Sequence, residues 1–149
     1  MKLKIKAVSP KIGAQLPFPF YASEGAAAMD LCACMDEPVE LMPRALVSLP
    51  TGIAIALPSA DYVALLFARS GLGVRHGICL SNGVGVIDSD YRGEISVGLV
   101  NLSDTPYTVR PGDRVAQLAV IPVVRAEIEL TEQLDETRRG QGGFGSTGT

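Results

Sequence analysis

Ten prolines, spread over a chain of 149 residues, restrict the fold more than any other feature of the sequence. A proline inside a helix removes a backbone donor and collides with the preceding turn, so this spacing argues against long helices. In β proteins, prolines stand at strand ends, at sheet edges and in turns. The ten are Pro10, Pro17, Pro19, Pro38, Pro43, Pro50, Pro58, Pro106, Pro111 and Pro122.

Short apolar runs separated by turn residues fill the spaces between the prolines. After an initial alternation of Leu3, Ile5 and Ala7 with lysines, they occupy residues 29–34, 39–42, 45–49, 52–57, 62–68, 95–101, 107–110 and 115–124. Many short strands at this spacing predict an all-β fold, a jelly-roll-like barrel or sandwich. Residues 70–75 are the best place for one short helix. We find no internal repeat and no sign of a second domain.

Composition and charge exclude several classes of function. A net charge of -3 and a pI near 5.1 argue against non-specific binding to nucleic acid. No apolar run is long enough to span a membrane, and the charged start MKLKIKAV is not a secretory signal, so we expect a cytoplasmic protein. With one histidine and three cysteines, a zinc site is not favoured. Any metal here is expected to have oxygen ligands.

Residues 81–94, SNGVGVIDSDYRGE, carry the densest group of candidate functional side chains. Their composition is that of an ordinary turn, and the pattern predicts a β-hairpin. Gly83 and Gly85 leave the backbone bare, so a flat ligand could lie against main-chain groups. Asp88 and Asp90 alternate with Ser89, which predicts that both carboxylates point to one side.

Three other segments carry further candidate residues for the same ligand. The string ARSGLG, residues 68–73, places Arg69 and Ser70 where a strand gives way to the short helix, a position that attracts phosphate and that also commonly carries helix caps. Asp30 interrupts an apolar strand, so it is either paired or faces a wet site. In PGDRVAQL, residues 111–118, Arg114 could pair with Asp113 or another acid. For this last segment two interpretations are equally plausible. Arg114 could belong to a salt-bridged turn and Gln117 could be a hydrogen-bonded amide in the core, or the two residues could have a functional role.

The end of the chain differs in kind from the rest. Residues 140–149, GQGGFGSTGT, are too rich in glycine to order alone, which predicts a disordered terminus. Phe144 is the one large apolar residue in this tail, five positions after Arg139. An aromatic ring and a guanidinium on a mobile segment indicate a lid over a flat ring and an anion.

Together, GVIDSDYRGE, ARSGLG, PGDRVAQL and RGQGGFGSTG resemble the trimeric dUTPase family over nearly the whole chain. The resemblance implies a β jelly roll over residues 1–136 and a flexible lid over 137–149. It also implies a homotrimer whose active sites are shared between subunits. The implied reaction is hydrolysis of dUTP to dUMP and pyrophosphate, which keeps uracil out of DNA and supplies dUMP for thymidylate synthesis.

The resemblance also implies a role for individual residues. Asp88 would activate the water that attacks the α-phosphorus. Asp30 would reach a magnesium ion through a water. The residues that would bind the uracil, deoxyribose and phosphates of the substrate, or stack on its base, are Arg69, Ser70, Gly71, Asn82, Gly85, Val86, Ile87, Tyr91, Ser96, Gln117, Arg139, Phe144 and Gly145.

Three alternatives remain at this point. A dCTP deaminase shares the implied fold and assembly and would use a glutamate, for which Glu94 is the candidate. A non-catalytic nucleotide-binding regulator would be expected to lack Asp88, Arg69 or the tail, all of which are present. A carbohydrate-binding jelly roll normally exposes clustered aromatic residues, and this sequence contains no such cluster.

Overall fold

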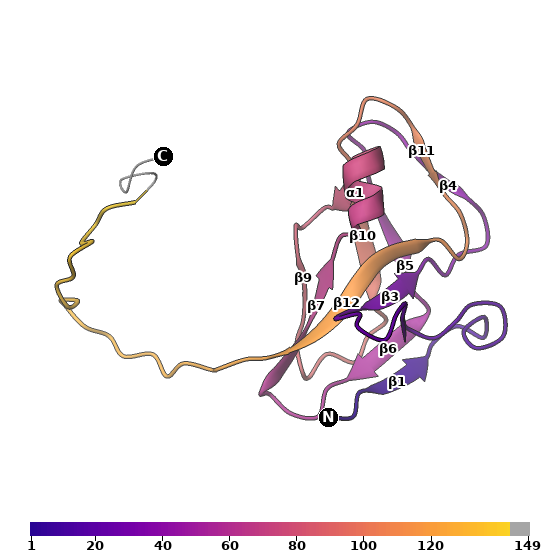
Figure 1. The fold of residues 1–149 in the computed structure, drawn as a ribbon. Helices are drawn as coiled ribbons and strands as arrows, with labels where there is room; N and C mark the ends of the chain where they lie inside the picture. The colour runs from indigo at the N-terminus through magenta and orange to yellow at the C-terminus, as the bar shows by residue number, and fades with distance from the viewer. Residues whose placement is uncertain (144–149) are drawn as a thin grey trace.

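The computed structural model describes residues 1–143 and is built almost entirely from short antiparallel strands (Figure 1). The strands are β1 (Lys4–Ala7), β2 (Phe20–Tyr21), β3 (Met29–Cys32), β4 (Val39–Leu41), β5 (Leu46–Pro50), β6 (Ile53–Ala56), β7 (Tyr62–Phe67), β8 (Ile78–Leu80), β9 (Gly85–Ile87), β10 (Ser96–Asn101), β11 (Tyr107–Val109) and β12 (Arg114–Pro122). The single helix of the described residues is α1 (Ser70–His76). The predicted all-β jelly-roll-like fold with one short helix is therefore confirmed.

Four β-sheets make up the body of the fold, which comprises the elements β1 to β12. The largest is a five-stranded sheet in the order β2-β3-β12-β7-β9, and the second is a three-stranded sheet in the order β5-β10-β8. Two smaller ladders pair β1 with β6 and β11 with β4. Apolar side chains from the sheets meet in one core, in which Leu31, Leu49, Ile53, Leu99 and Leu118 are among the largest fully buried residues. Burial of these aliphatic side chains is the main favourable contribution to folding.

Helix α1 ends as the sequence leads one to expect. Its last residue is followed by Gly77, which adopts a left-handed conformation with φ of 68° and donates its backbone N–H to the carbonyl of Gly73. A glycine suits this position because L side chains rarely adopt a positive φ. The helix thus turns directly into β8, and Arg69 lies at its start, immediately after β7.

Beyond β12 the chain leaves the body as an extended arm (Figure 1). Residues 123–143 contain no strand or helix, and the apolar side chains of Val124, Ile128, Leu130 and Leu134 are almost fully exposed. In Figure 1 the arm lies far from the strands of its own chain. The strands end at Pro122, whereas a boundary between domain and lid at residue 136 stays a prediction.

No helix within residues 1–143 combines the length and the apolar character needed to cross a membrane.

Candidate active site

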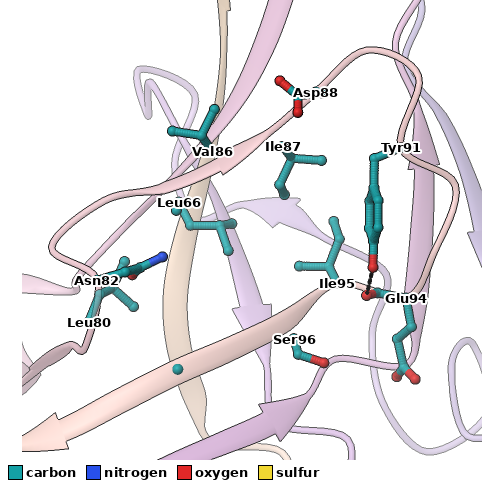
Figure 2. A pocket seen from close by; sticks show the side chains of 12 residues that line it. Leu66, Leu80, Asn82, Val86, Ile87, Asp88, Tyr91, Glu94, Ile95 and Ser96 are labelled. Atoms are coloured by element: carbon teal, nitrogen blue, oxygen red, sulfur yellow. Dashed lines mark hydrogen bonds between the residues drawn. The ribbon is translucent and has the colours of Figure 1, made fainter.

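A pocket of about 290 Å³ lies between β9 and β10 (Figure 2). Asn82 stands at one side of it and Tyr91 at the other, with apolar side chains between them. The lining residues are Leu66, Leu80, Asn82, Gly85, Val86, Ile87, Asp88, Tyr91, Glu94, Ile95, Ser96 and Gly98. The pocket therefore brings together seven of the residues predicted to form the site, namely Asn82, Gly85, Val86, Ile87, Asp88, Tyr91 and Ser96.

The predicted hairpin is wrong in one respect, because β9 and β10 do not pair with each other. Strand β9 pairs with β7 in the five-stranded sheet, and β10 pairs with β5 and β8 in the other sheet. Turn-forming residues between two apolar runs predict two strands and a reversal, but they do not specify the partner of each strand. Residues 88–95 thus connect two sheets, and the pocket occupies the space between the strands.

Strand β9 is the edge strand of its sheet, and within residues 1–143 its second edge pairs with no strand. Backbone groups at such an edge are available to a ligand. A Cβ atom on Gly85 would lie 2.9 Å from Cβ of Leu66, so only glycine allows β9 to approach β7 this closely. On the opposite wall, a Cβ atom on Gly98 would lie 2.5 Å from Oγ of Ser81. Bare backbone therefore forms part of both walls.

Asp88 lies at the rim of the pocket, directly after β9 (Figure 2). Its side chain is exposed, and no residue of the described chain donates a hydrogen bond to its carboxylate. Residues 88–91 form a turn in which the backbone N–H of Tyr91 donates to the carbonyl of Asp88 at 3.2 Å. The strand alternation expected for Asp88 and Asp90 therefore does not extend to them, because the strand ends at Ile87.

The ring of Tyr91 stands at the far side of the pocket and is held by one hydrogen bond. Its hydroxyl donates to the carbonyl of Glu94 at 3.0 Å. The ring is packed over Gly93, where a Cβ atom would lie 2.3 Å from the Tyr91 hydroxyl oxygen. Any side chain at position 93 would therefore displace the ring.

A second polar group lies around the start of α1 and is built on Asp30. The side chain of Asp30 is only 2% exposed, and its two oxygens accept from Nε of Arg69 at 3.0 Å and from Nη1 of Arg114 at 2.9 Å. Arg69 also donates from Nη1 to the carbonyl of Arg114 at 3.3 Å. Of the two environments predicted for Asp30, the structure shows the paired one. Arg114 takes this acid rather than Asp113 as its partner.

Gln117 belongs to the same group by register. It lies opposite Asp30 on β3 and opposite Phe67 on β7, close to Arg69 at the end of that strand. Ser70 and Gly71 are exposed on the first turn of α1. The residues predicted to hold phosphates thus lie together, in the part of the sheet that adjoins α1.

The two groups are separate within one chain. Arg69, Ser70, Gly71 and Gln117 do not line the pocket between β9 and β10. Arg139 lies on the arm, where its Nε donates to the carbonyl of Gly142 at 2.8 Å. The remaining predicted residues, Phe144 and Gly145, fall outside the described residues.

Several residues that line the pocket have no recognisable signal in the sequence. Leu66, Ile95 and Gly98 stand in ordinary apolar runs and Leu80 lies outside them, and only the tertiary arrangement brings these four to one cavity. The sequence points to Glu94 only as the candidate residue of a deaminase, yet its carboxylate accepts from the backbone N–H of Gly52 at 2.7 Å. Residues 1–143 contain no cluster of three or more His, Cys, Asp or Glu side chains that could hold a metal ion.

Fold and pocket together define a small antiparallel β protein with a glycine-walled pocket at a sheet edge and a separate group of two arginines paired with Asp30. The dUTPase family model matches residues 14–148. The chain therefore belongs to the dUTPase family. A deoxyuridine 5'-triphosphate nucleotidohydrolase of Salmonella typhimurium is 47% identical over 147 residues, which cover 99% of this chain and 97% of the relative.

Solved structures of phage dUTPases have the same fold. The dUTPase of Staphylococcus bacteriophage 80alpha, solved with dUPNHPP, superposes with a TM-score of 0.86 at 24% identity and covers 99% of both chains. A variant dUTPase from phage phi11 of S. aureus, whose structure describes a structural Mg(II) ion, superposes with a TM-score of 0.78 at 21% identity. That match covers 91% of this chain and 100% of the phage chain.

Proposed function

We propose that this chain hydrolyses dUTP to dUMP and pyrophosphate, with Asp88 as the general base. The observation that carries the proposal is the position of an exposed carboxylate, to which no residue of 1–143 donates a hydrogen bond, at the rim of a glycine-walled pocket in a chain of the dUTPase family. The reaction would remove a source of uracil in DNA and supply dUMP for thymidylate synthesis. Because the substrate is a free nucleotide, we expect the protein to act in the cytoplasm and without a nucleic-acid partner.

Uracil is read by backbone groups and one amide. Gly85, Val86 and Ile87 present the free edge of β9, while Asn82 and the backbone at Ser96 face it from the other side. Uracil and cytosine exchange donor and acceptor at the base edge, and a mismatched buried polar group is costly. A 5-methyl group would overlap the walls of so narrow a pocket, which excludes thymine.

Deoxyribose is selected by Tyr91. Its ring lies beside the pocket, tied by its hydroxyl to the main chain at Glu94, and would pack against the sugar. The ring would leave no space for a 2′-hydroxyl. UTP should therefore be a very poor substrate.

Hydrolysis proceeds by attack of water at the α-phosphorus. The Asp88 carboxylate takes a proton from the water as its oxygen bonds to phosphorus, and the bond from the α-phosphorus to the bridging oxygen breaks. The bridging oxygen leaves with the β- and γ-phosphates as pyrophosphate. A carboxylate is a modest base, so orientation of the water and neutralisation of charge on the phosphates account for most of the acceleration.

The phosphates are bound by Arg69, Ser70, Gly71 and Gln117. Because this group does not line the base pocket of its own chain, a complete site requires the pocket of one subunit and the anion group of another. We therefore propose a homotrimer with shared sites. Residues 1–136 would form the jelly-roll domain and 137–149 a lid, with Arg139 on the γ-phosphate and Phe144 and Gly145 over the base of a neighbouring subunit.

Magnesium is the expected cofactor, and the fit of its proposed site can be tested on Asp30. Both oxygens of Asp30 accept hydrogen bonds from arginines, yet a carboxylate offers about four acceptor positions, so its oxygens keep the capacity to accept from a water bound to the ion. No carboxylate cluster accompanies it in residues 1–143, which suits an ion held mainly by phosphate oxygens and waters. When bound, the ion would neutralise charge on the triphosphate.

A dCTP deaminase is the nearest alternative. That chemistry needs a glutamate free to act at C4 of the base, whereas the Glu94 carboxylate is hydrogen-bonded to the backbone of Gly52. This contact favours a structural role for Glu94 and hence the hydrolase. Release of pyrophosphate from dUTP, with no release of ammonia from dCTP, is the expected result. Ammonia from dCTP without pyrophosphate from dUTP would refute the proposed function.

A further inference from the structure

Glu94 makes two hydrogen bonds that face different parts of the molecule. Its carbonyl accepts from the hydroxyl of Tyr91 at 3.0 Å, and its carboxylate accepts from the backbone N–H of Gly52 at 2.7 Å. Gly52 lies in the turn between β5 and β6, outside the pocket. Figure 2 shows the hydrogen bond between Tyr91 and Glu94, and the second contact links Glu94 to a turn elsewhere in the barrel.

The turn that holds Glu94 is itself fixed by the core. Gly52 has a φ of 72°, and a Cβ atom there would lie 2.7 Å from Sγ of Cys34 and 2.9 Å from Cγ1 of Ile12. Its neighbour Thr51 is buried and donates from Oγ1 to the carbonyl of Ile95 at 2.6 Å. Since the residue after Glu94 is tied to the same turn, the turn is a rigid support for this part of the connection.

The ring of Tyr91 depends on that support because, apart from its contact with Gly93, much of the residue faces solvent. The residue is 47% exposed, and its side chain makes a single hydrogen bond within the part of the chain that the structure describes. Exclusion of a 2′-hydroxyl by overlap works only if the ring cannot move aside. A half-exposed ring has that freedom unless its far end is held.

We propose that Glu94 is a positioning residue that sets the discrimination against ribonucleotides. Its carboxylate fixes the main chain at position 94 against the β5–β6 turn, and its carbonyl then fixes the Tyr91 hydroxyl. The inference rests on the proposed function, in which Tyr91 packs against deoxyribose. It adds a residue that touches neither base nor phosphate and acts through Tyr91.

The test compares kcat/KM for dUTP and UTP in wild type, Glu94→Ala, Glu94→Gln and Glu40→Ala. Glutamine keeps an oxygen that can accept from Gly52, whereas alanine does not. Glu40 is an exposed glutamate on β4, away from the pocket, and serves as the matched control. Loss of one supporting hydrogen bond should raise the UTP:dUTP ratio about tenfold in Glu94→Ala. The ratio should stay within about twofold of wild type in the other two variants.

A second variant keeps the test decisive if Glu94→Ala does not fold. Tyr91→Phe removes the same link from the other end and should raise the ratio similarly, and in the double variant the two effects should not add. An unchanged ratio in folded Glu94→Ala or in Tyr91→Phe, or fully additive effects, would overturn the role of Glu94. Failure of the proposed function is a different result, since wild type would then release no pyrophosphate from dUTP.

Discussion

Buried Asp30 on β3 and partly exposed Arg69 at the start of α1 form an ion pair, with 3.0 Å between Oδ1 of the acid and Nε of the arginine. The pair uses one of the five N–H donors of Arg69, and Nη1 donates a second to the carbonyl of Arg114, so two donors are directed toward the protein. The remaining face of the guanidinium keeps a defined direction, which suits a group that receives a phosphate.

Removal of the charge of Asp30 should destabilise the fold, because two arginines then share a site with no anion. Asp30→Asn should lower the free energy of unfolding by about 3 kcal/mol, the usual consequence of breaking a buried ion pair at one end. Urea denaturation measures this quantity. Asp36→Asn, at an exposed ion pair with Lys11, is the control and should change it by less than about 1 kcal/mol. Equal effects of the two substitutions would contradict the structural importance of Asp30.

Asp88→Asn should bind dUTP with nearly normal affinity and lose turnover. The amide keeps the shape of the side chain but cannot accept the proton, and general-base catalysis contributes roughly a hundredfold to ten-thousandfold. Single-turnover kinetics and equilibrium binding separate the two quantities. Asp90→Asn alters the same turn two residues later and should retain most of the activity. An Asp88→Asn enzyme with more than about a tenth of wild-type turnover would exclude Asp88 as the base.

Gly85→Ala should damage the pocket, because the added methyl group has no space beside Leu66. We expect β9 to move from β7 and KM for dUTP to rise about tenfold, as one misplaced wall removes binding contacts. Gly25→Ala is the matched control, since a Cβ atom at position 25 meets no other atom within 4 Å. An unchanged KM in Gly85→Ala would show that the backbone of β9 does not contact the base.

Truncation after Leu134 should leave the barrel folded and trimeric but abolish most activity. The arm contributes no strand to the body of its own chain, and loss of the lid would leave the substrate open to water. Circular dichroism and sedimentation test the first part, and pyrophosphate release the second. Phe144→Ala should reproduce part of the loss, about 1–3 kcal/mol by analogy with stacking of bases on aromatic rings.

Mixed trimers test whether the lid serves a neighbouring subunit. Subunits that lack the tail retain Asp88, and Asp88→Asn subunits retain the tail. If the tail acts across subunits, combining the two inactive proteins should restore measurable turnover. No recovery after verified subunit exchange would mean that each tail serves only its own chain.

Cys32 should react slowly with alkylating agents at pH 8. Burial raises the pKa of its thiol, and the negative charge of Asp30 raises it further, so little thiolate is present until the pH is well above the ordinary range. Cys79 is more exposed and serves as the internal comparison. Mass spectrometry after iodoacetamide treatment should show Cys79 modified first, and the rate at Cys32 should rise steeply with pH. Faster modification of Cys32 would contradict its burial beside Asp30.

The strands and the helix could be predicted because their signals are local. The run predicted at 62–68 became Tyr62–Phe67, the run at 95–101 became Ser96–Asn101, and the helix predicted at 70–75 became Ser70–His76. Strand β2 has only two residues and follows Pro19, too short for a periodic signal. Prediction therefore worked where four or more residues carried one pattern.

Pairing over long distances could not be predicted from those signals. Arg114 and Asp30 are 84 positions apart, and neither residue type indicates which partner it will meet. The separation of β9 from β10 could not be predicted for the same reason, because β9 pairs with β7 whereas β10 pairs with β8. The family resemblance implies the individual candidate residues, whereas their division into a base pocket and an anion group within one chain required the structure.

The open edge of β9 has a thermodynamic consequence. A nucleobase bound there would take the place of a missing strand and join the two sheets on either side of residues 88–95. The free energy of that contact would then be part of the stability of the barrel, and would grow with the logarithm of ligand concentration. The free energy of unfolding would thereby rise with nucleotide concentration. The loop that carries Asp88 and Tyr91 would be the part of the molecule most affected.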